Sequence, residues 1–417
     1  MPNYQLKMLT AGVSALVVVL GVAAPAWSQE KTPNPLEITT PDLLLPESSV
    51  ERPLSPLELL RFKEELDQLN AQATAQYQAG NAAQAFDIWN RELRLRRTLG
   101  TLEEVRALGR VGEVAWEGNQ KTQVQVITKR LEAIQQELEK PSSSSSRRPQ
   151  TSQLITKDSA LSTNKEELRE ALGKAYEQVR SPQQALTIYE QILAQARQSN
   201  DVAAKESTLK TMGQLQMAYF DYPKAAATYE ELLKISQDQS DVVDQVEYLK
   251  QLSYIYDKAK EPENALKVKL RLVESYQAVP NNPQFPALLI AIASDYHALN
   301  QPEQASQNYQ QAYTLAVANQ QFGDATEALQ KLGALYQQYE QPEFALQIYE
   351  VLLQIEQRSY DYYGLMNTYD KMGQIHLQQQ NYPQALTAFQ EGLELARSLQ
   401  YEESHFTKQI EQINQQP

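Results

Sequence analysis

The sequence predicts an all-α protein that stacks about eight helical hairpins one after another. Residues that favour helices dominate the 417-residue chain, which holds only 14 glycines. In addition, small, aromatic and proline residues recur at a constant interval of 40 residues. The recurrence is plain in two similar stretches, SPQQALTIYEQIL at 181–193 and QPEFALQIYEVLL at 341–353. Such a fixed interval is typical of proteins built from one repeated structural unit.

The first 28 residues have the layout of a secretory signal peptide. Lys7 is their one charged side chain, an apolar run follows it, and small residues precede a candidate cut at Gln29. This order predicts removal of residues 1–28 and export to a periplasm or a thylakoid lumen. The alternative is an uncleaved membrane anchor, because the run Met8–Trp27 is barely long enough to span a bilayer.

Residues 29–55 predict an extended, proline-rich tether. Prolines in a polar stretch prevent regular helix or sheet, and the prolines here are Pro33, Pro35, Pro41, Pro46 and Pro53. Order is predicted to begin at Ser55, which directly precedes Pro56 and is followed by Glu58. A serine cap, a proline in the first turn and a nearby glutamate are typical of a helix start.

Residues 56–140 predict two N-terminal repeats that follow the 40-residue pattern less closely than the later ones. Ala73, Ala85 and Trp89 occupy the repeat positions of the first. The second is degenerate and keeps Gly112. We therefore expect two further hairpins in this region.

Residues 141–163 predict a serine-rich linker, because the stretch PSSSSSRRPQTSQ is polar, proline-bounded and aperiodic. Helical patterning resumes at Asn164, three residues before Glu167. Two interpretations stay open: the linker separates two rigid arms, or it loops out of one continuous stack.

Residues 164–400 predict six repeats of 40 residues. A column of small residues consists of Gly173, Gly213, Ser253, Ala293, Gly333 and Gly373. A column of alanines consists of Ala185, Ala225, Ala265, Ala305, Ala345 and Ala385. An aromatic column, interrupted once by lysine, consists of Tyr189, Tyr229, Lys269, Tyr309, Tyr349 and Phe389. We expect the small residue to face the alanine where two helices cross, and the aromatic residue to fill the space between successive hairpins.

Residues 401–417 predict a polar capping helix. Phe406, Ile410 and Ile413 form a single narrow apolar stripe on an otherwise polar segment. A stack of repeats is open at its end, so its last helix needs a polar outer face to keep the protein soluble.

The repeat resembles the tetratricopeptide repeat (TPR) family. The clearest copy is LGALY at 332–336, followed by Pro342, Ala345 and Tyr349, and the pattern covers residues from about 57 to 400. The usual period is about 34 residues, so longer helices are expected here. The resemblance implies a right-handed superhelix, an α-solenoid, whose first helices line a concave groove for an extended peptide or a partner helix.

Helix geometry then selects the side chains that face this groove. They stand three residues before, one after and four after the small residue of each repeat, opposite the buried face of the first helix. By repeat, they are Glu170, Lys174 and Glu177; Lys210, Gln214 and Met217; Lys250, Tyr254 and Asp257; Ile290, Ser294 and His297; Gln330, Ala334 and Gln337; and Asp370, Gln374 and Leu377. The set lacks the lysine-and-asparagine clamp of chaperone-binding members, so an acidic chaperone tail is not the expected partner.

No residue pattern in the chain indicates catalysis. There are no cysteines and only three histidines, and neither His-Glu-x-x-His, a glycine-rich phosphate loop nor Gly-x-Ser-x-Gly occurs. We therefore expect no enzyme, no catalytic residue and no organic cofactor. Asp257 and His297 stand on neighbouring repeats of the predicted groove, so joint binding of Mn²⁺ is one hypothesis for them. A purely polar groove lining is the alternative.

The net charge of −14 disfavours nucleic acid and anionic lipid, both of which attract basic proteins. Contact with a membrane is expected only through an uncleaved signal or a membrane-protein partner. The cluster at 360–363 holds three tyrosines. Two interpretations stay open for it: a partner-facing patch, or packing between repeats.

The sequence therefore predicts a non-enzymatic, exported scaffold that binds a protein or an extended peptide in its groove. Its export signal, repeat content, length and acidity are similar to those of cyanobacterial TPR proteins that assist photosystem II assembly. That resemblance implies binding of a reaction-centre precursor and supply of manganese. The alternative is a cell-envelope adaptor in secretion or polysaccharide export.

Overall fold

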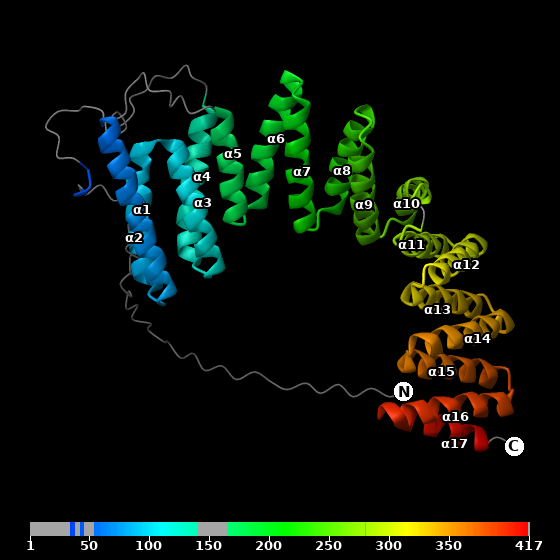
Figure 1. Cartoon of the computed structure of the whole chain (residues 1–417). Coiled ribbons are helices and arrows are strands. Elements are labelled where there is room, and N and C mark those ends of the chain that lie inside the picture. Colours follow the sequence, from blue (N-terminus) through cyan, green and yellow to red (C-terminus); the bar gives the residue numbers. More distant parts are fainter. Residues whose placement is uncertain (1–33, 38–41, 46–53, 141–164, 280, 416–417) are drawn as a thin grey trace, which may run out of the picture. The chain divides into compact units, whose positions relative to one another are not determined.

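The computed structural model describes residues 34–37, 42–45, 54–140, 165–279 and 281–415. Within them, seventeen α-helices and one short 3₁₀ helix pack as consecutive hairpins, which confirms the predicted all-α repeat fold (Figure 1). The predicted signal peptide and the predicted serine-rich linker lie outside the described residues.

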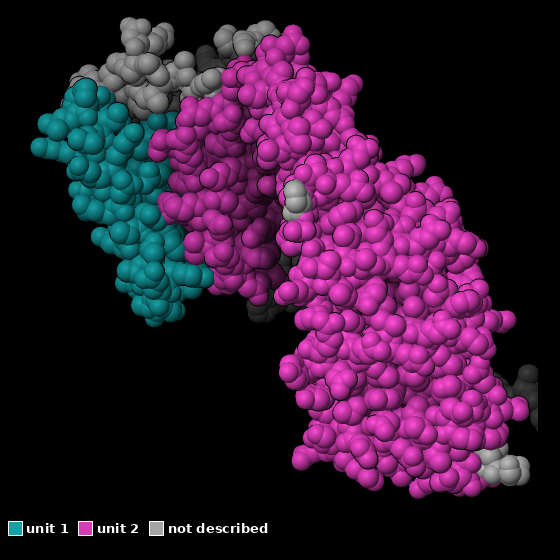
Figure 2. All heavy atoms as spheres, turned by 45° about the vertical axis from the view of Figure 1, so that its right-hand side comes forward, with its two compact units in different colours: residues 1–100, 146–158 teal, residues 101–145, 159–417 magenta. Residues whose placement is uncertain are grey.

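The described residues divide into two compact units, one up to Gly100 and one from Thr101 onward (Figure 2). Unit 1 contains helices α1 (Pro56–Gln78) and α2 (Ala82–Arg96) and the 3₁₀ helix η1 (Arg97–Leu99). The two repeats predicted at 56–140 thus fall into different units. The physical reason is that α3, the first helix of unit 2, packs against α4 and α5 of its own unit.

The start of α1 confirms the predicted helix signal. The Ser55 hydroxyl accepts a hydrogen bond from the Glu58 backbone N–H at 3.3 Å, and the Glu58 carboxylate accepts one from the Ser55 N–H at 2.8 Å. Two backbone donors that the helix itself leaves unpaired are therefore satisfied. Trp89 on α2 is buried and donates its indole N–H to Asn70 on α1 at 3.0 Å, which joins the two helices.

The two described pieces of the predicted tether are not extended, and that prediction is wrong for them. Both form turns that lie against α2. Arg91 holds the Asp42 carboxylate through two hydrogen bonds of 2.7 Å, and Arg94 donates to the carbonyl oxygen of Pro35 at 2.6 Å. Leu36 is buried. Proline content predicts the lack of helix, but it carries no information on arginines elsewhere in the chain that bind the segment.

Unit 2 is a series of helices of similar length. They are α3 (Thr101–Glu117), α4 (Lys121–Glu139), α5 (Lys165–Gln178), α6 (Pro182–Ser199), α7 (Val202–Ala218), α8 (Tyr222–Asp238), α9 (Val242–Ala259), α10 (Pro262–Gln277), α11 (Phe285–Ala298), α12 (Pro302–Ala318), α13 (Phe322–Gln338), α14 (Pro342–Ser359), α15 (Tyr362–Gln378), α16 (Tyr382–Leu399) and α17 (Glu403–Asn414). From α5 onward each helix packs on the next one in the chain, so each 40-residue repeat is one hairpin.

The turns explain why the repeat interval is constant. From Asn300 to Gln400, one residue in the left-handed backbone conformation stands at every twentieth position. Such a residue ends one helix and lets the next begin within two residues. Asp201 and Asp361 then cap the following helices by accepting backbone N–H bonds at 2.9 and 2.8 Å. One repeat is therefore two helices and two tight turns.

The alanine column is fully buried, as the sequence predicts, but the glycine column meets a different neighbour. Each glycine faces the aromatic ring of its own hairpin rather than the alanine. A Cβ on Gly213 would stand 2.8 Å from the Tyr229 ring, and one on Gly373 would stand 2.6 Å from the Phe389 ring. The missing side chain thus makes room for the ring inside the hairpin. The 40-residue interval predicts which residues recur, but it does not predict which of these recurring residues are in contact.

The last helix, α17, covers the end of the stack. Phe406 and Ile413 are buried, and the Phe406 ring meets the Phe389 ring edge-on at a centroid distance of 6.5 Å. Ile410 packs beside them, so all three residues of the predicted stripe lie in one apolar cluster. None of the described helices has the length and apolar character needed to cross a bilayer.

Candidate functional site

The predicted groove residues lie on the first helices of successive hairpins, α5, α7, α9, α11, α13 and α15. All ten of the polar and aromatic positions that we expect to contact a ligand are at least partly exposed. They are Lys174, Lys210, Gln214, Lys250, Tyr254, Asp257, Ser294, His297, Gln337 and Gln374. The prediction is wrong for Ile290, which is buried in the apolar cluster formed by α11, α12 and α13 and cannot contact a partner. Ligand binding by the others stays a prediction.

In two repeats, the position four residues after the small residue has an internal role that the sequence did not reveal. The Tyr349 hydroxyl donates to Gln337 at 2.9 Å, and the Tyr189 hydroxyl donates to Glu177. Where the aromatic residue is Phe389 and has no hydroxyl, this position is Leu377. These side chains hold the polar end of the buried ring, so they are only partly available to a ligand. The sequence signal for this contact was a tyrosine that follows a polar residue by 12 positions, with the two residues on different helices of one hairpin.

Lys269, the one lysine of the aromatic column, is buried and ion-paired with two carboxylates. Its Nζ lies 2.6 Å from Asp257 Oδ1 on α9 and 2.8 Å from Asp295 Oδ2 on α11. Burial raises the pKa of Asp295, whereas the hydrogen bond from Lys269 acts in the opposite direction. The triad links three consecutive helices. The sequence signal for this triad was Asp295, because the corresponding residues of the next two repeats are the apolar Leu335 and Ile375.

The predicted manganese pair does not form a shared site. Asp257 is bound to Lys269, and the Nε2 atom of His297 lies 2.9 Å from the Gln338 amide oxygen. Over the described ranges, no group of three or more histidine and acidic side chains is placed to hold a metal ion. Each residue of the pair is engaged by another side chain, Lys269 or Gln338, so the residues present do not fit Mn²⁺.

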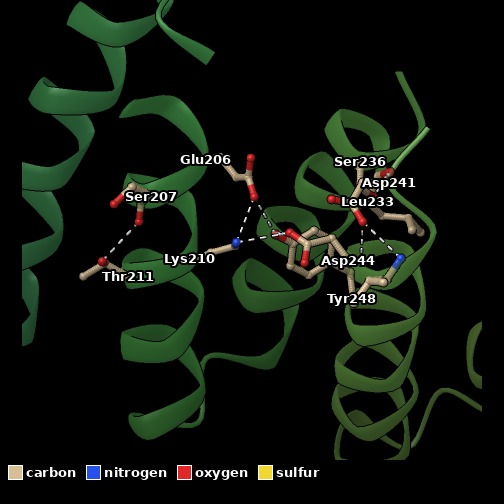
Figure 3. A network of polar contacts seen from close by, with 10 residues as sticks. Glu206, Ser207, Lys210, Thr211, Leu233, Ser236, Asp241, Asp244 and Tyr248 are labelled. Atoms are coloured by element: carbon tan, nitrogen blue, oxygen red, sulfur yellow. Dashed lines mark hydrogen bonds and ion pairs between the residues drawn. The ribbon is translucent and has the colours of Figure 1, made fainter. Parts of the chain in front are cut away.

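Lys210 is already engaged by acidic side chains, as Figure 3 shows. Its Nζ lies 2.8 Å from Glu206 on the same helix and 3.2 Å from Asp244 on α9. The Tyr248 hydroxyl lies 3.0 Å from each of these two carboxylates. The hydrogen bond to Glu206 is the main cause that raises the pKa of Lys210. The network ties α7 to α9 and neutralises this lysine.

Lys250, by contrast, forms no ion pair with the part of the chain that the structure describes. Its Nζ lies 5.9 Å from the centroid of the Tyr276 ring. One turn further along α9, Tyr254 exposes 48% of its surface. A cation without an acidic partner beside an exposed aromatic ring is the pairing that protein-binding surfaces favour.

A cavity of about 310 Å³ opens beside Lys250 between α9, α10 and α11. Leu272 and Tyr276 line it from α10, and Leu288 lines it from α11. At its rim the Tyr276 hydroxyl donates to Gln284 at 2.9 Å. The first-helix face of α9 therefore combines a cation, an exposed ring and an apolar recess large enough for one side chain.

Comparison with known families supports the repeat assignment. Two tetratricopeptide repeat models match, at residues 168–203 and 320–398, which fall on α5–α6 and α13–α16. None of the curated proteins matches the sequence.

Several solved structures are similar in fold. BtubC (BKLC) from P. vanneervenii is 16% identical, with 53% of this chain and 92% of that chain covered and a TM-score of 0.38. The apo form of RapI is 11% identical, with coverages of 84% and 97% and a TM-score of 0.38. Aspartyl phosphate phosphatase F from Bacillus subtilis is 15% identical, with coverages of 74% and 78% and a TM-score of 0.40. These scores are low, so the assignment depends on the repeat models and on the helical hairpins themselves.

Proposed function

We propose that this tetratricopeptide repeat protein is a non-enzymatic scaffold that holds an extended segment of another protein on its first-helix face. The observation that supports this most is the surface of α9, where Lys250 lines the 310 Å³ cavity and Tyr254 is exposed one turn further along the same helix. An apolar side chain of the segment enters the cavity, and a carboxylate of the same segment pairs with Lys250. Neighbouring first helices then contribute hydrogen-bonding side chains such as Gln214 and Ser294.

We further propose that the chain is exported, on the strength of the charge and apolar pattern of residues 1–28. Two classes of partner follow from the sequence: a precursor of photosystem II, or the machinery of secretion or polysaccharide export. A role in manganese supply is not part of the proposal, because Asp257 and His297 do not form a metal site.

Affinity capture with the full chain from a membrane extract, followed by mass spectrometry, tests this proposal. We expect a defined set of proteins to be captured by the wild type and lost with the double variant Lys250→Ala/Tyr254→Ala. The matched control is Tyr219→Ala/Lys224→Ala, which also removes one exposed tyrosine and one exposed lysine but lies outside the predicted groove.

The identity of the captured proteins decides between the two partner classes. Photosystem subunits support the assembly role, and secretion or cell-wall machinery supports the adaptor. If the Lys250→Ala/Tyr254→Ala variant captures the same proteins as the control, the first-helix face of α9 is not the binding site.

A further inference from the structure

A second and larger cavity lies among the second helices of the last two repeats. It measures about 700 Å³ and is bounded by α14, the start of α15, and α16. Tyr360 and Tyr362 line it and expose 76% and 51% of their surfaces, and Tyr369 lines it from one side. Exposed tyrosines around a cavity are typical of interaction surfaces, because their rigid rings offer contact area at a low entropic cost.

Three carboxylates face the same cavity: Glu350 from α14, and Glu391 and Glu394 from α16. None of the three forms an ion pair with any described residue. Burial raises the pKa of Tyr369, and the charge of Glu391 adds to that effect. The cavity is therefore an acidic, aromatic recess without a cation of its own among the described side chains.

The repeat four intervals earlier shows how the chain neutralises a carboxylate at the same position. Glu231 on α8 is the counterpart of Glu391, 160 residues before it. The guanidinium of Arg197 on α6 lies 2.6 Å from Glu231, and the ammonium of Lys205 on α7 lies 3.0 Å from it. In that repeat the chain supplies both cations itself.

The later repeat has no cation at either of those two positions. Gln357 stands where the earlier repeat has the arginine, and Leu365 stands where it has the lysine. Both of these replacements line the cavity. A third cation is replaced by an acid, because Glu394 is the counterpart of Lys234. The cavity therefore coincides with the place that an arginine and a lysine fill in the earlier repeat.

The rings of the cavity are also particular to the later repeat. Tyrosines take the place of three smaller or aliphatic residues, and the earlier counterparts of Tyr360, Tyr362 and Tyr369 are Asn200, Val202 and Leu209. The earlier repeat has an internally paired surface here, whereas the later repeat has three rings, no cation at these positions and an open site. A planar guanidinium suits such a site, because it stacks on aromatic faces and pairs with carboxylates through two hydrogen bonds.

We propose that the cavity between α14, α15 and α16 binds an arginine side chain from an extended basic segment of a partner protein. The guanidinium pairs with Glu391 and Glu350 and stacks on a tyrosine ring, while Glu394 attracts a neighbouring basic residue of the segment. None of the predicted groove residues lines this cavity, so the site is independent of the function proposed above and can fail or hold separately from it.

The test is the binding of a fluorescein-labelled, acetylated heptapeptide that carries two arginines among glycines, measured by fluorescence anisotropy on the full chain at about 150 mM salt. We expect saturable binding of this peptide and none of a peptide with citrulline in place of arginine. Glu391→Gln should weaken binding roughly tenfold. Glu190→Gln is the matched control, because it removes one exposed glutamate at the counterpart of Glu350 in the earlier repeat and should leave the affinity unchanged.

A second variant, Gln357→Arg/Leu365→Lys, restores the two cations of the earlier repeat. It should abolish peptide binding while keeping or raising the melting temperature, so that loss of binding cannot be attributed to unfolding. Equal affinity for the wild type, Glu391→Gln and Gln357→Arg/Leu365→Lys would overturn the proposal. Displacement of the peptide by spermidine at equal concentration would also overturn it, because the site would then select charge rather than a protein segment.

Discussion

Two hairpins of the stack, α9–α10 and α13–α14, each bury one side chain of a type that is charged in water at neutral pH, and they deal with it in opposite ways. In the first, Lys269 is paired with two carboxylates at 2.6 and 2.8 Å. In the second, Glu356 is fully buried without a cation in ion-pair distance among the described residues. Its Oε2 atom has no hydrogen-bond partner there. Burial raises the pKa of Glu356 to about 7, against hydrogen bonds from Thr368 and Gln330.

The difference shows that a repeat position fixes where a side chain stands, while its neighbours decide which chemistry is tolerated there. Lys269 stands where most other repeats have tyrosine, and its partner Asp295 stands where the next two repeats have an apolar residue. Glu356 replaces Ala196 of an earlier repeat, and Gly364 stands beside it, where an added Cβ would lie 2.7 Å from the Glu356 carboxylate. One hairpin keeps the charge by pairing it, and the other lowers the cost by favouring the neutral form.

Removal of the buried cation should give the largest effect. Lys269→Ala leaves Asp295 buried without its partner, and we expect the free energy of unfolding to fall by about 3–5 kcal/mol. Urea unfolding followed by circular dichroism measures this loss. Lys331→Ala is the matched control, because that lysine is exposed and its ion pair with Glu327 at 3.6 Å contributes little. Similar losses in both variants would show that the triad does not stabilise the fold.

The pH dependence of stability should show that the hairpin α13–α14 buries Glu356 in its neutral form. Because the pKa of Glu356 in the folded chain is about 7 and its ordinary value is 4.5, the folded chain holds a proton that the unfolded chain releases between these values. Stability should therefore fall as pH rises from about 4.5 to 7, by at most about 3 kcal/mol. Two nearby charges also act on Glu356: the negative charge of Asp361 favours its protonated form, and the positive charge of Lys371 favours its ionised form.

The variant Glu356→Gln isolates this effect, since glutamine keeps the shape of the neutral acid. Its stability should change less with pH than that of the wild type, and the difference should be largest above pH 7. If the free energies of unfolding of the two proteins in urea change with pH in parallel, Glu356 is not the cause of the pH dependence of stability.

The smallest expected effect concerns the glycine that receives the ring of α14. Gly333→Ala places a Cβ against the Tyr349 ring, and we expect a loss of about 1–3 kcal/mol from overpacking. The control is Gly323→Ala on the same helix, where a Cβ would meet nothing within 4 Å. There the helix preference for alanine should make the change neutral or slightly stabilising. Equal melting temperatures for the two variants would contradict the packing of ring on glycine.

The comparison of these hairpins also shows what the sequence could predict. The interval of 40 residues places every hairpin from α5 to α16, and helix geometry correctly leaves Lys250 partly exposed and Tyr254 exposed. The contact partner of each column could not be predicted, because the same spacing is compatible with glycine facing either alanine or tyrosine. The ion pairs of Lys269 depend on distances between three helices, which a linear pattern does not contain.

The candidate sites also combine features that the sequence predicts with features that only the structure shows. Alignment of the repeats shows that Glu391 corresponds to Glu231, and that step needs only the sequence. That Arg197 reaches across to Glu231, and that a cavity opens where its counterpart is glutamine, follows only from the structure. The folded-back segment around Asp42 is a similar case, since its partner Arg91 lies 49 residues away.

The most direct test of the central claim exchanges the chemistry of one hairpin for that of the other. The variant Ser253→Gly/Asp257→Gln/Lys269→Tyr/Asp295→Leu gives α9–α11 the residues that α13–α15 has at the small, groove and aromatic positions, together with an apolar residue in place of Asp295. If position is fixed by the repeat and chemistry by the neighbours, urea unfolding should show a stability within about 1 kcal/mol of the wild type or above it. A loss as large as that of Lys269→Ala would contradict the account.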